Sequence, residues 1–340
     1  MSDVGADCRL AVARVRRHLL VPLVWLLAAG TCCTAWGQAP AKSAPWPSRT
    51  VRIVVGFPGG STPDLAARTL AEPLSRALGQ PVIIENRVGA SGNIAADVVA
   101  KATDDHTLGV VINGNLTSAR QLYARLPYNP ATDFSLISLL TTAPLVLIAP
   151  AGLPGGSAFL AAARQAGSQW NFGSPGNGSV AHLGMELIKS RVPGVEPVHI
   201  PYAGNPQVIT AMLGGQVQMA LVPPGIALPH LRAGTLRGIG LAGGRSALAP
   251  EIAPLADIGI QGLDLEVWTA LVAPAGLAPA ARARLTELVP RLLREADIRQ
   301  KLFAQGWQAV GSSPEGLITR LQSETQLLGN IIRLRGIKIE

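Results

Sequence analysis

The sequence contains little cysteine, few aromatic side chains and little charge. Among its 340 residues there are 3 cysteines, 4% aromatic residues and 15% charged residues. Cys8, Cys32 and Cys33 all lie near the start, so the chain beyond them has no disulfide, no thiol nucleophile and no thiolate metal ligand. The scarcity of aromatic side chains argues against a surface that stacks bases or sugars.

Motifs for metals and nucleotide cofactors are also missing. The sequence has 5 histidines, at His18, His106, His182, His199 and His230. Their spacing is not that of a metal site, and no lysine-containing phosphate loop occurs. Residues 238–243 match G-x-G-x-x-G, but Pro250 soon follows and leaves little room for the helix that would receive a pyrophosphate. We interpret this segment as a turn and expect neither a metal nor a cofactor.

The formal net charge of +8 raises the question of nucleic-acid binding. Residues 1–39 contribute four arginines and two aspartates, so the remainder of the chain carries +6. The basic residues of this remainder are scattered and form no run that could follow a phosphate backbone. The sequence therefore argues against a nucleic-acid partner and indicates a mildly positive field that favours anionic solutes.

The first 39 residues have the pattern of a secretory signal peptide. Arg9–His18 is basic, Leu19–Gly30 is apolar, and Gly37-Gln38-Ala39 places small residues before a cleavage site. The apolar core of about a dozen residues is shorter than the ~20 that a membrane-spanning helix needs. We therefore predict cleavage near Ala39 and a periplasmic protein.

A lipid anchor is the alternative for this leader. The doublet Cys32-Cys33 resembles a lipoprotein box, but Thr31 occupies a position where Gly, Ala or Ser is wanted. We therefore expect a cleaved product without a lipid.

The chain after the leader alternates between short apolar runs and amphipathic segments. Strands are expected at 51–55, 81–85, 108–112, 145–149, 170–173, 198–201, 217–222, 236–241 and 267–273. Helices are expected at 63–78, 93–102, 157–166, 181–190, 206–213 and 228–232, and from 279 onward. This alternation predicts an α/β protein with βαβ units around mostly parallel sheets that are flanked by helices.

Two features divide this α/β chain into two lobes. The alternation restarts after the strand at 145–149, and the strand at 267–273 would run back toward the first lobe. The chain would cross between the lobes near residues 144–151 and 266–274, which makes a two-segment hinge. The expected division is lobe 1 at residues 40–148 and 268–340 and lobe 2 at residues 149–267.

Two loops between a strand and a helix could bind an anion. The first, Gly59–Thr62, precedes a helix for which Thr62 is the expected N-cap and Pro63 the first residue. The second, residues 173–179, offers three glycines, two hydroxyls and an amide before the next helix. Glycines let a ligand approach the backbone, and N–H groups at a helix start attract anions. Facing each other across a cleft, the two loops could replace the water around a carboxylate.

An enzyme, such as a periplasmic hydrolase or isomerase, is the competing hypothesis for the second loop. Ser179 and His182 lie three residues apart at an expected helix start, so a nucleophile–base pair is conceivable. No G-x-S-x-G turn surrounds Ser179, and no acid is positioned by the sequence to orient His182. We therefore expect His182 to be a packing or helix-surface residue and the protein not to be an enzyme.

Many short blocks along the chain together form a family pattern. They are 46–49, 57–58, 64–68, 78–83, 85–87, 89–94, 126–128, 133–134, 172–174, 176–179, 199–202, 213–217 and 273–276. With these blocks in order, the chain from about Trp46 to its end resembles the Bug proteins, the substrate-binding receptors of tripartite tricarboxylate transporters. The resemblance implies a type II periplasmic binding-protein fold that closes around a carboxylated solute, without catalysis.

The resemblance also implies which residues line the cleft. In order along the chain they are Phe57, Gly60, Ser61, Thr62, Asn113, Ser174, Asn177, Gly178, Ser179, Tyr202 and Asn205. In the first loop, Ser61 and Pro63 replace a family pattern of two adjacent glycines and no proline. The segment Leu221–Pro224 stands where some relatives have a polar or acidic pair. Both departures bear on which carboxylate is bound.

The resemblance further implies partners. These are a small carboxylate solute and the membrane subunits of a tripartite transporter, with a sensor of a signalling system as the alternative, and we expect a monomer. An exported nucleic-acid-binding or adhesion protein is suggested only by the net charge, and the scattered basic residues and few aromatics oppose it.

Overall fold

The computed structural model describes residues 46–339. The expected signal peptide, its cleavage near Ala39 and the three cysteines lie outside the described residues. Within the described part of the chain, no helix combines the length and the apolar character needed to cross a membrane.

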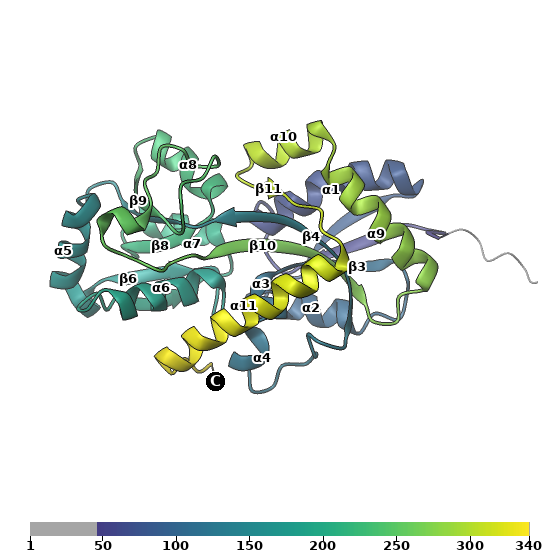
Figure 1. Ribbon diagram of the computed structural model, residues 1–340, viewed down its shortest axis with the longest axis horizontal. Helices are drawn as coiled ribbons and strands as arrows, with labels where there is room; N and C mark the ends of the chain where they lie inside the picture. The colour runs from purple at the N-terminus through teal and green to yellow at the C-terminus, as the bar shows by residue number, and fades with distance from the viewer. Residues whose placement is uncertain (1–45, 340) are drawn as a thin grey trace, which may run out of the picture. The chain divides into compact units, whose positions relative to one another are not determined.

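The first sheet has the strand order β11-β4-β10-β3-β1-β2 (Figure 1). The strands are β1 Val51–Val55, β2 Val82–Asn86, β3 Thr107–Ile112, β4 Phe134–Pro144, β10 Glu266–Pro274 and β11 Gln308–Ala309. β1 pairs in parallel with β2 and β3, whereas β10 is antiparallel to β3 and β4. β3 is buried along its whole length, as expected for an apolar strand inside a sheet that is covered on both faces.

The second sheet has the strand order β7-β6-β8-β5-β9. The strands are β5 Val146–Pro150, β6 Asn171–Ser174, β7 Val198–Pro201, β8 Met219–Val222 and β9 Leu236–Leu241. β6 is parallel to β7 and β8, and β5 is antiparallel to β8 and β9. The two-sheet α/β fold is therefore confirmed, but both sheets are mixed, because the strands at the crossings between them run antiparallel to their neighbours.

Helices flank both sheets. With the first sheet lie α1 Thr62–Leu78, α2 Asn93–Ala100, α3 Asn113–Leu116, α4 Ala119–Leu122, α9 Pro279–Leu293 and α10 Ala296–Ala304. With the second lie α5 Gly156–Ala166, α6 Val180–Arg191, α7 Asn205–Leu213 and α8 Pro224–Arg232. The last helix, α11 Pro314–Arg335, contacts both β4 and α6. We refer to each sheet with its helices as the first and the second lobe.

Helix α1 begins one residue earlier than expected. Ser61, with an extended backbone, is its N-cap in place of Thr62, so Pro63 is the second helical residue. Gly79 ends the helix with a φ of 73°, a left-handed conformation that glycine adopts without strain. Leu70 and Leu74 are buried on the core side, as their spacing predicts.

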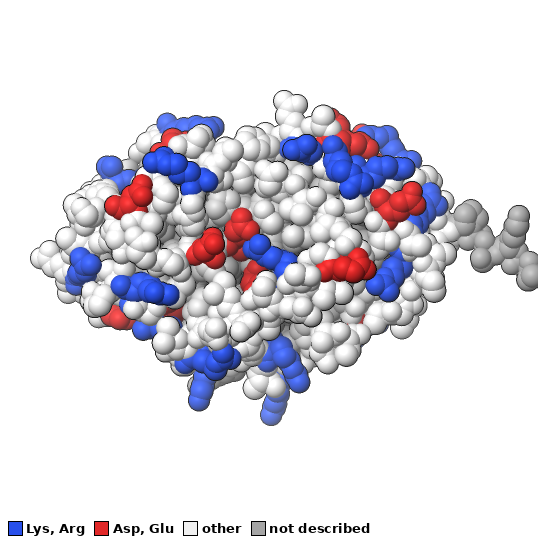
Figure 2. Space-filling model, viewed as in Figure 1, with Lys and Arg blue, Asp and Glu red and all other residues white. Residues whose placement is uncertain are grey.

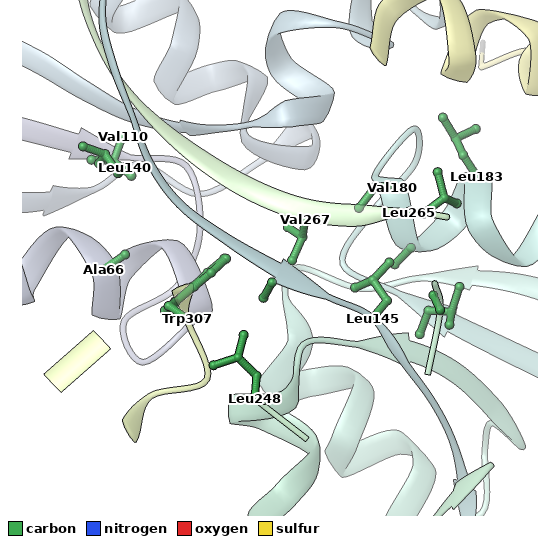
Figure 3. Close-up of a cluster of buried hydrophobic side chains, with 14 of the residues drawn as sticks. Ala66, Val110, Leu140, Leu145, Val180, Leu183, Leu248, Leu265, Val267 and Trp307 are labelled. Atoms are coloured by element: carbon green, nitrogen blue, oxygen red, sulfur yellow. The ribbon is translucent and has the colours of Figure 1, made fainter. Parts of the chain in front are cut away.

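Two segments of the chain connect the two sheets. β4 ends at Pro144 and β5 begins at Val146, so Leu145 alone joins them, and β10 enters the first sheet at Glu266. Leu145, Val267 and Trp307 are buried in one apolar cluster that continues past both crossings (Figure 3). The crossings are therefore part of the core, and each large apolar side chain buried there contributes roughly 1.5–3 kcal/mol to the stability of the fold.

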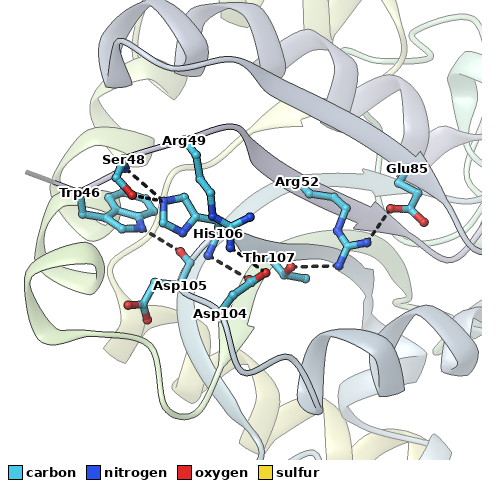
Figure 4. Close-up of polar contacts among 9 residues, drawn as sticks. All are labelled: Trp46, Ser48, Arg49, Arg52, Glu85, Asp104, Asp105, His106 and Thr107. Atoms are coloured by element: carbon cyan, nitrogen blue, oxygen red, sulfur yellow. Dashed lines mark hydrogen bonds and ion pairs between the residues drawn. The ribbon is translucent and has the colours of Figure 1, made fainter. Parts of the chain in front are cut away.

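The start of the described chain is fixed to the edge of the first lobe (Figure 4). The Trp46 indole donates to the main-chain oxygen of Asp105 at 2.8 Å, and the Ser48 N–H donates to His106 Nε2 at 3.1 Å. Arg284 of α9 donates to the Trp46 oxygen at 2.7 Å. These contacts hold the segment that leads into β1 between β3 and α9.

Charged side chains of both signs are interspersed on the face shown in Figure 2. Ion pairs within the described chain include Arg320 with Glu266 and Arg335 with Glu186, each at 3.0 Å. The second pair links α11 to α6 and thus ties the last helix to the second lobe. This face agrees with the scattered basic residues in the sequence.

Candidate ligand-binding site

The parallel strands of both sheets lead into the segments named by the sequence. β1 is followed by Gly56–Ser61 and β3 by Asn113, while β6 is followed by residues 175–179 and β7 by Tyr202. Ligands of open α/β sheets bind outside the carboxyl ends of parallel strands. Each lobe therefore presents such an edge, formed by two neighbouring strands.

Hydrogen bonds show that the two edges touch. Asn205 Nδ2 of α7 donates to Thr62 Oγ1 of α1 at 3.3 Å. Ser118 Oγ of the first lobe donates to the Gly178 oxygen of the second at 2.7 Å, and Tyr123 donates its hydroxyl to the Asn177 oxygen at 3.3 Å. The structure therefore has the two lobes in a closed arrangement.

The first loop is shaped by a buried carboxylate. Asp64 accepts hydrogen bonds from the Gly60 N–H at 2.9 Å, from Arg68 Nε at 2.9 Å and from Asn86 Nδ2 at 2.8 Å. Burial would raise the pKa of Asp64, but these hydrogen bonds outweigh it and hold that pKa below its ordinary value. The Gly60 N–H is thus already used within the loop, and Asp64 positions the loop instead of binding ligand.

The second loop is shaped by histidine rings in the core. Ser179 is the N-cap of α6, and its hydroxyl accepts from the His182 backbone N–H at 3.2 Å. The Gly178 N–H donates to the His182 ring at Nδ1 at 3.1 Å. Burial lowers the pKa of His182 to about 4, so the ring is neutral near pH 7 and can accept this bond.

A second histidine holds the start of the same loop. Ser174 Oγ lies 2.7 Å from His199 Nε2 and also accepts from the Gly176 N–H at 3.2 Å. The ring of His199 stacks on His182 with 3.9 Å between centroids and on Phe172 with 4.7 Å. Burial and the neighbouring His182 lower the pKa of His199 to about 3, so this ring is also neutral.

These contacts decide against the catalytic hypothesis for Ser179 and His182. The serine hydroxyl caps α6 and bonds to the backbone of His182, while the imidazole bonds to Gly178. Unlike the Ser61 hydroxyl, which has no hydrogen-bond partner, the Ser179 hydroxyl and the His182 ring are both occupied by bonds to backbone N–H groups. The expectation that His182 is a packing residue is confirmed, since the ring stacks within the core.

Two aromatic residues, Phe57 and Tyr202, were expected to line the cleft, and each packs against a glycine of its own lobe. The ring of Phe57 is buried and lies so close to Gly92 that a Cβ there would be 2.9 Å from Phe57 Cε2. Tyr202 is half-buried, and its ring lies beside Gly173. Both rings therefore support the loops by packing.

Several buried polar atoms at the facing edges have no partner. Among residues 46–339, Ser61 Oγ, Asn113 Oδ1, Asn205 Oδ1 and Gln207 Oε1 are buried without a hydrogen bond. A buried polar group left unsatisfied costs about 1–3 kcal/mol, and native proteins usually satisfy such groups with a ligand or water. Ser61, Asn113 and Asn205 are all on the sequence-derived list, whereas Gln207 had no sequence signal that set it apart.

The space between the closed lobes is small. A cavity of about 10 Å³, enough for about one water, is lined by Gly114, Ser118, Tyr123 and Gly178. A larger hollow of about 1140 Å³ lies elsewhere, between α11 and the start of β4. The unpartnered atoms and the strand topology, and not cavity size, define the candidate site, and a solute needs the lobes to move apart.

Two α/β lobes that meet at the carboxyl ends of their parallel strands and are joined by two segments are typical of solute-binding receptors. Residues 66–337 match the family described as the tripartite tricarboxylate transporter family receptor, and the chain belongs to this family. It is a family of solute-binding receptors and not of enzymes, which confirms the expected absence of catalysis.

Individual relatives agree with this assignment. BugT of Bordetella pertussis is 31% identical over 312 residues, which cover 90% of this chain and 95% of BugT. The structure of MatC from Rhodopseudomonas palustris, with bound malate, is similar with a TM-score of 0.79 and 31% identity, covering 84% of this chain and 100% of MatC. Rpa4515 of the same organism, solved with adipate, has a TM-score of 0.82 and 30% identity and covers 86% and 99%.

Proposed function

We propose that this receptor captures a small carboxylate between its two lobes in the periplasm and delivers it, as a monomer, to the membrane subunits of a tripartite transporter. The leader is cleaved near Ala39 in this proposal. The lobes are residues 40–148 with 268–340, and residues 149–267. The relatives solved with malate and adipate support the carboxylate, because both ligands are small dicarboxylates.

The observation that carries the proposal is the set of unpartnered polar atoms at the closed edges. Ser61 Oγ can donate to a carboxylate, and two helix N-termini lie close to it as sources of positive potential: that of α1, which Ser61 caps, and that of α7, where Asn205 bonds to Thr62. The two loops contain no lysine or arginine. Binding would therefore rest on hydroxyls, amides, helix dipoles and bridging water.

Capture requires the lobes to open and then close over the solute. Opening separates Asn205 from Thr62 and Gly178 from Ser118, the contacts that now join the edges. The connections at Leu145 and before Glu266 are the two places where the chain can bend. A bound carboxylate would stabilise the closed state by bridging the groups that lack partners.

Calorimetry with the mature protein tests this function. Succinate, malate, adipate and citrate should include a ligand that binds, and glucose should not bind. Asn205→Ala should weaken carboxylate binding by about tenfold, because it removes one amide from the site. Asn171→Ala is the matched control, since this asparagine lies at the opposite end of β6 and bonds to Gln216.

Three results would contradict the proposal. They are tight binding of glucose, binding of none of the carboxylates, and full carboxylate affinity in the Asn205→Ala protein.

A further inference from the structure

The C-terminal helix brings a buried carboxylate to the back of the candidate site. Glu324 of α11 is 6% exposed. Its Oε1 accepts from Asn113 Nδ2 at 2.6 Å, and its Oε2 accepts from Trp268 Nε1 at 2.5 Å and from Arg320 Nε at 3.2 Å. Three donors surround this carboxylate, and one of them is the Arg320 guanidinium, which favours the ionised form and so strengthens the hydrogen bonds that the carboxylate accepts.

The side-chain amide of Asn113 is fixed in one orientation. Besides Glu324, its Nδ2 also donates to the main-chain oxygen of Glu266 at 3.1 Å. A carboxylate and a carbonyl accept hydrogen bonds, so a rotated amide would place its own oxygen against two other oxygens. Asn113 Oδ1 must therefore point away from α11 and β10.

The oxygen of Asn113 has no partner. The residue is 0% exposed, and Oδ1 is among the unsatisfied buried atoms of the described chain. The next residue, Gly114, lies against the second lobe, since a Cβ on it would be 3.2 Å from the Gly178 oxygen. The unpartnered oxygen thus belongs to the part of the first lobe that closes on the second.

An acceptor at this place selects for a donor on the ligand. A carboxylate group brings only acceptors and would repel the Asn113 oxygen, whereas a hydroxyl or ammonium group would satisfy it. We propose that Asn113 determines specificity by accepting a hydrogen bond from a hydroxyl or ammonium group of the ligand, and that Glu324 positions it. The ligand class is therefore a carboxylate that also carries such a donor, an inference that rests on the proposed function.

The unpartnered amide oxygen of Asn205, also at the interface between the lobes, does not select for a donor on the ligand. Asn205 donates through Nδ2 to the hydroxyl of Thr62. A hydroxyl can donate or accept, so the amide of Asn205 can rotate and offer either end to a ligand. Of these two asparagines, Asn113 is the one whose amide is held by two obligate acceptors, the Glu324 carboxylate and the Glu266 main-chain oxygen.

Matched ligands test the selection directly. Malate differs from succinate by one hydroxyl group, and aspartate differs from succinate by one ammonium group. Calorimetry on the mature wild-type protein should show at least one of them binding about tenfold more tightly than succinate. Equal or tighter binding of succinate than of both would overturn the inference and leave the carboxylate receptor intact, whereas binding of none of the three would count against both.

Glu324→Gln tests the positioning role. A glutamine can donate from its amide to Asn113 Oδ1, so one of the two acceptors that fix the Asn113 amide is lost and only the Glu266 main-chain oxygen still opposes its rotation. The preference for the donor-bearing ligand over succinate should then fall to about one or reverse. A merely structural role would lower affinity for all ligands equally, so an unchanged ratio would refute the positioning role.

Two further variants make the test independent of the stability of Glu324→Gln. Asn113→Ala removes the acceptor, so the ratio of the affinities for the donor-bearing ligand and for succinate should fall to about one, independently of any change in the absolute affinities; a preserved ratio would overturn the inference. Glu186→Gln is the matched control, because Glu186 is also a buried carboxylate that anchors α11, through Arg335 at 3.0 Å. Its ligand preference should equal that of the wild type.

Discussion

Mild acid should destabilise the protein through the stacked histidines beneath the second loop. Above the ordinary histidine pKa of about 6.5, His182 is neutral in both the folded and the unfolded chain. As the pH falls below that value, the unfolded chain takes up a proton, whereas folded His182 stays neutral until its pKa of about 4. Stability is therefore lost from about pH 6.5 downward, because the unfolded state binds more protons.

The size of the effect follows from the two pKa values. Between pH 7 and pH 5, a histidine that titrates near 6.5 unfolded and near 4 folded removes about 2 kcal/mol from the free energy of unfolding. His199 adds to this loss, and because its ring lies 3.9 Å from His182, the two rings titrate as a pair. A domain of marginal stability would show a lowered unfolding midpoint.

Urea unfolding at several pH values, with wild type and His182→Gln compared, measures this loss. Glutamine keeps an acceptor for the Gly178 N–H but does not titrate. The wild type should lose about 2 kcal/mol more than the variant between pH 7 and pH 5. Subtracting the loss in the variant from the loss in the wild type removes the contribution of Glu324, which both proteins contain. Burial raises the pKa of Glu324, so its protonation favours the folded state in acid.

His230→Gln changes a histidine outside the stack and should leave the wild-type pH profile unchanged. Parallel pH profiles for wild type and His182→Gln would show that the buried histidine does not govern acid stability.

Other variants probe the loops and the interface. Gly178→Ala should cost about 1–2 kcal/mol in backbone strain, because φ is 76°, and should also weaken ligand binding, because the added Cβ hinders closure. Gly215→Ala, at φ 75° and with open space around it, should show the strain alone, so equal ligand affinities of the two variants would refute a role of Gly178 in closure. Asp64→Asn should lower the thermal midpoint by weakening three hydrogen bonds, while Glu72→Gln, an exposed ion-pair partner on the same helix, should change stability by less than about 1 kcal/mol. Trp307→Phe should destabilise by about 1–3 kcal/mol, measured by urea unfolding, because it removes part of a fully buried ring together with the indole donor to the Thr62 carbonyl.

Elements with a clear local pattern could be predicted from the sequence. The β-branched run of β1 and the helix α1 were found within one residue of their bounds, because apolar spacing and a terminal Gly79 mark them. β4 was missed. Its residues are buried on both faces of the sheet, so polar and apolar residues do not alternate along it. It also includes serine and threonine residues, which are typical of loops. Those hydroxyls are satisfied inside the sheet, as in the 2.7 Å contact between Thr141 and Thr269.

Missing β4 also explains why the sheets were expected to be mostly parallel. Alternating strands and helices imply parallel neighbours, but β4 runs into β5 with only Leu145 between them, and β10 returns antiparallel between β3 and β4. Strand direction at a crossing depends on which sheet the next strand enters. That choice is made by contacts far apart in sequence, which local patterns do not contain.

In the candidate site, too, the local sequence predicts the loops, whereas contacts between residues far apart in the sequence decide what those loops offer to a ligand. Glycines and hydroxyls between a strand and a helix identify the two loops, but they do not say which N–H groups remain free, and the Gly60 N–H is taken by Asp64. The orientation of Asn113 depends on Glu324, 211 residues away, on a helix whose charged residues read as solvent-facing. The chemistry that a loop offers to a ligand is therefore set by what lies behind it, and here that is a carboxylate that turns an ambivalent amide into a hydrogen-bond acceptor.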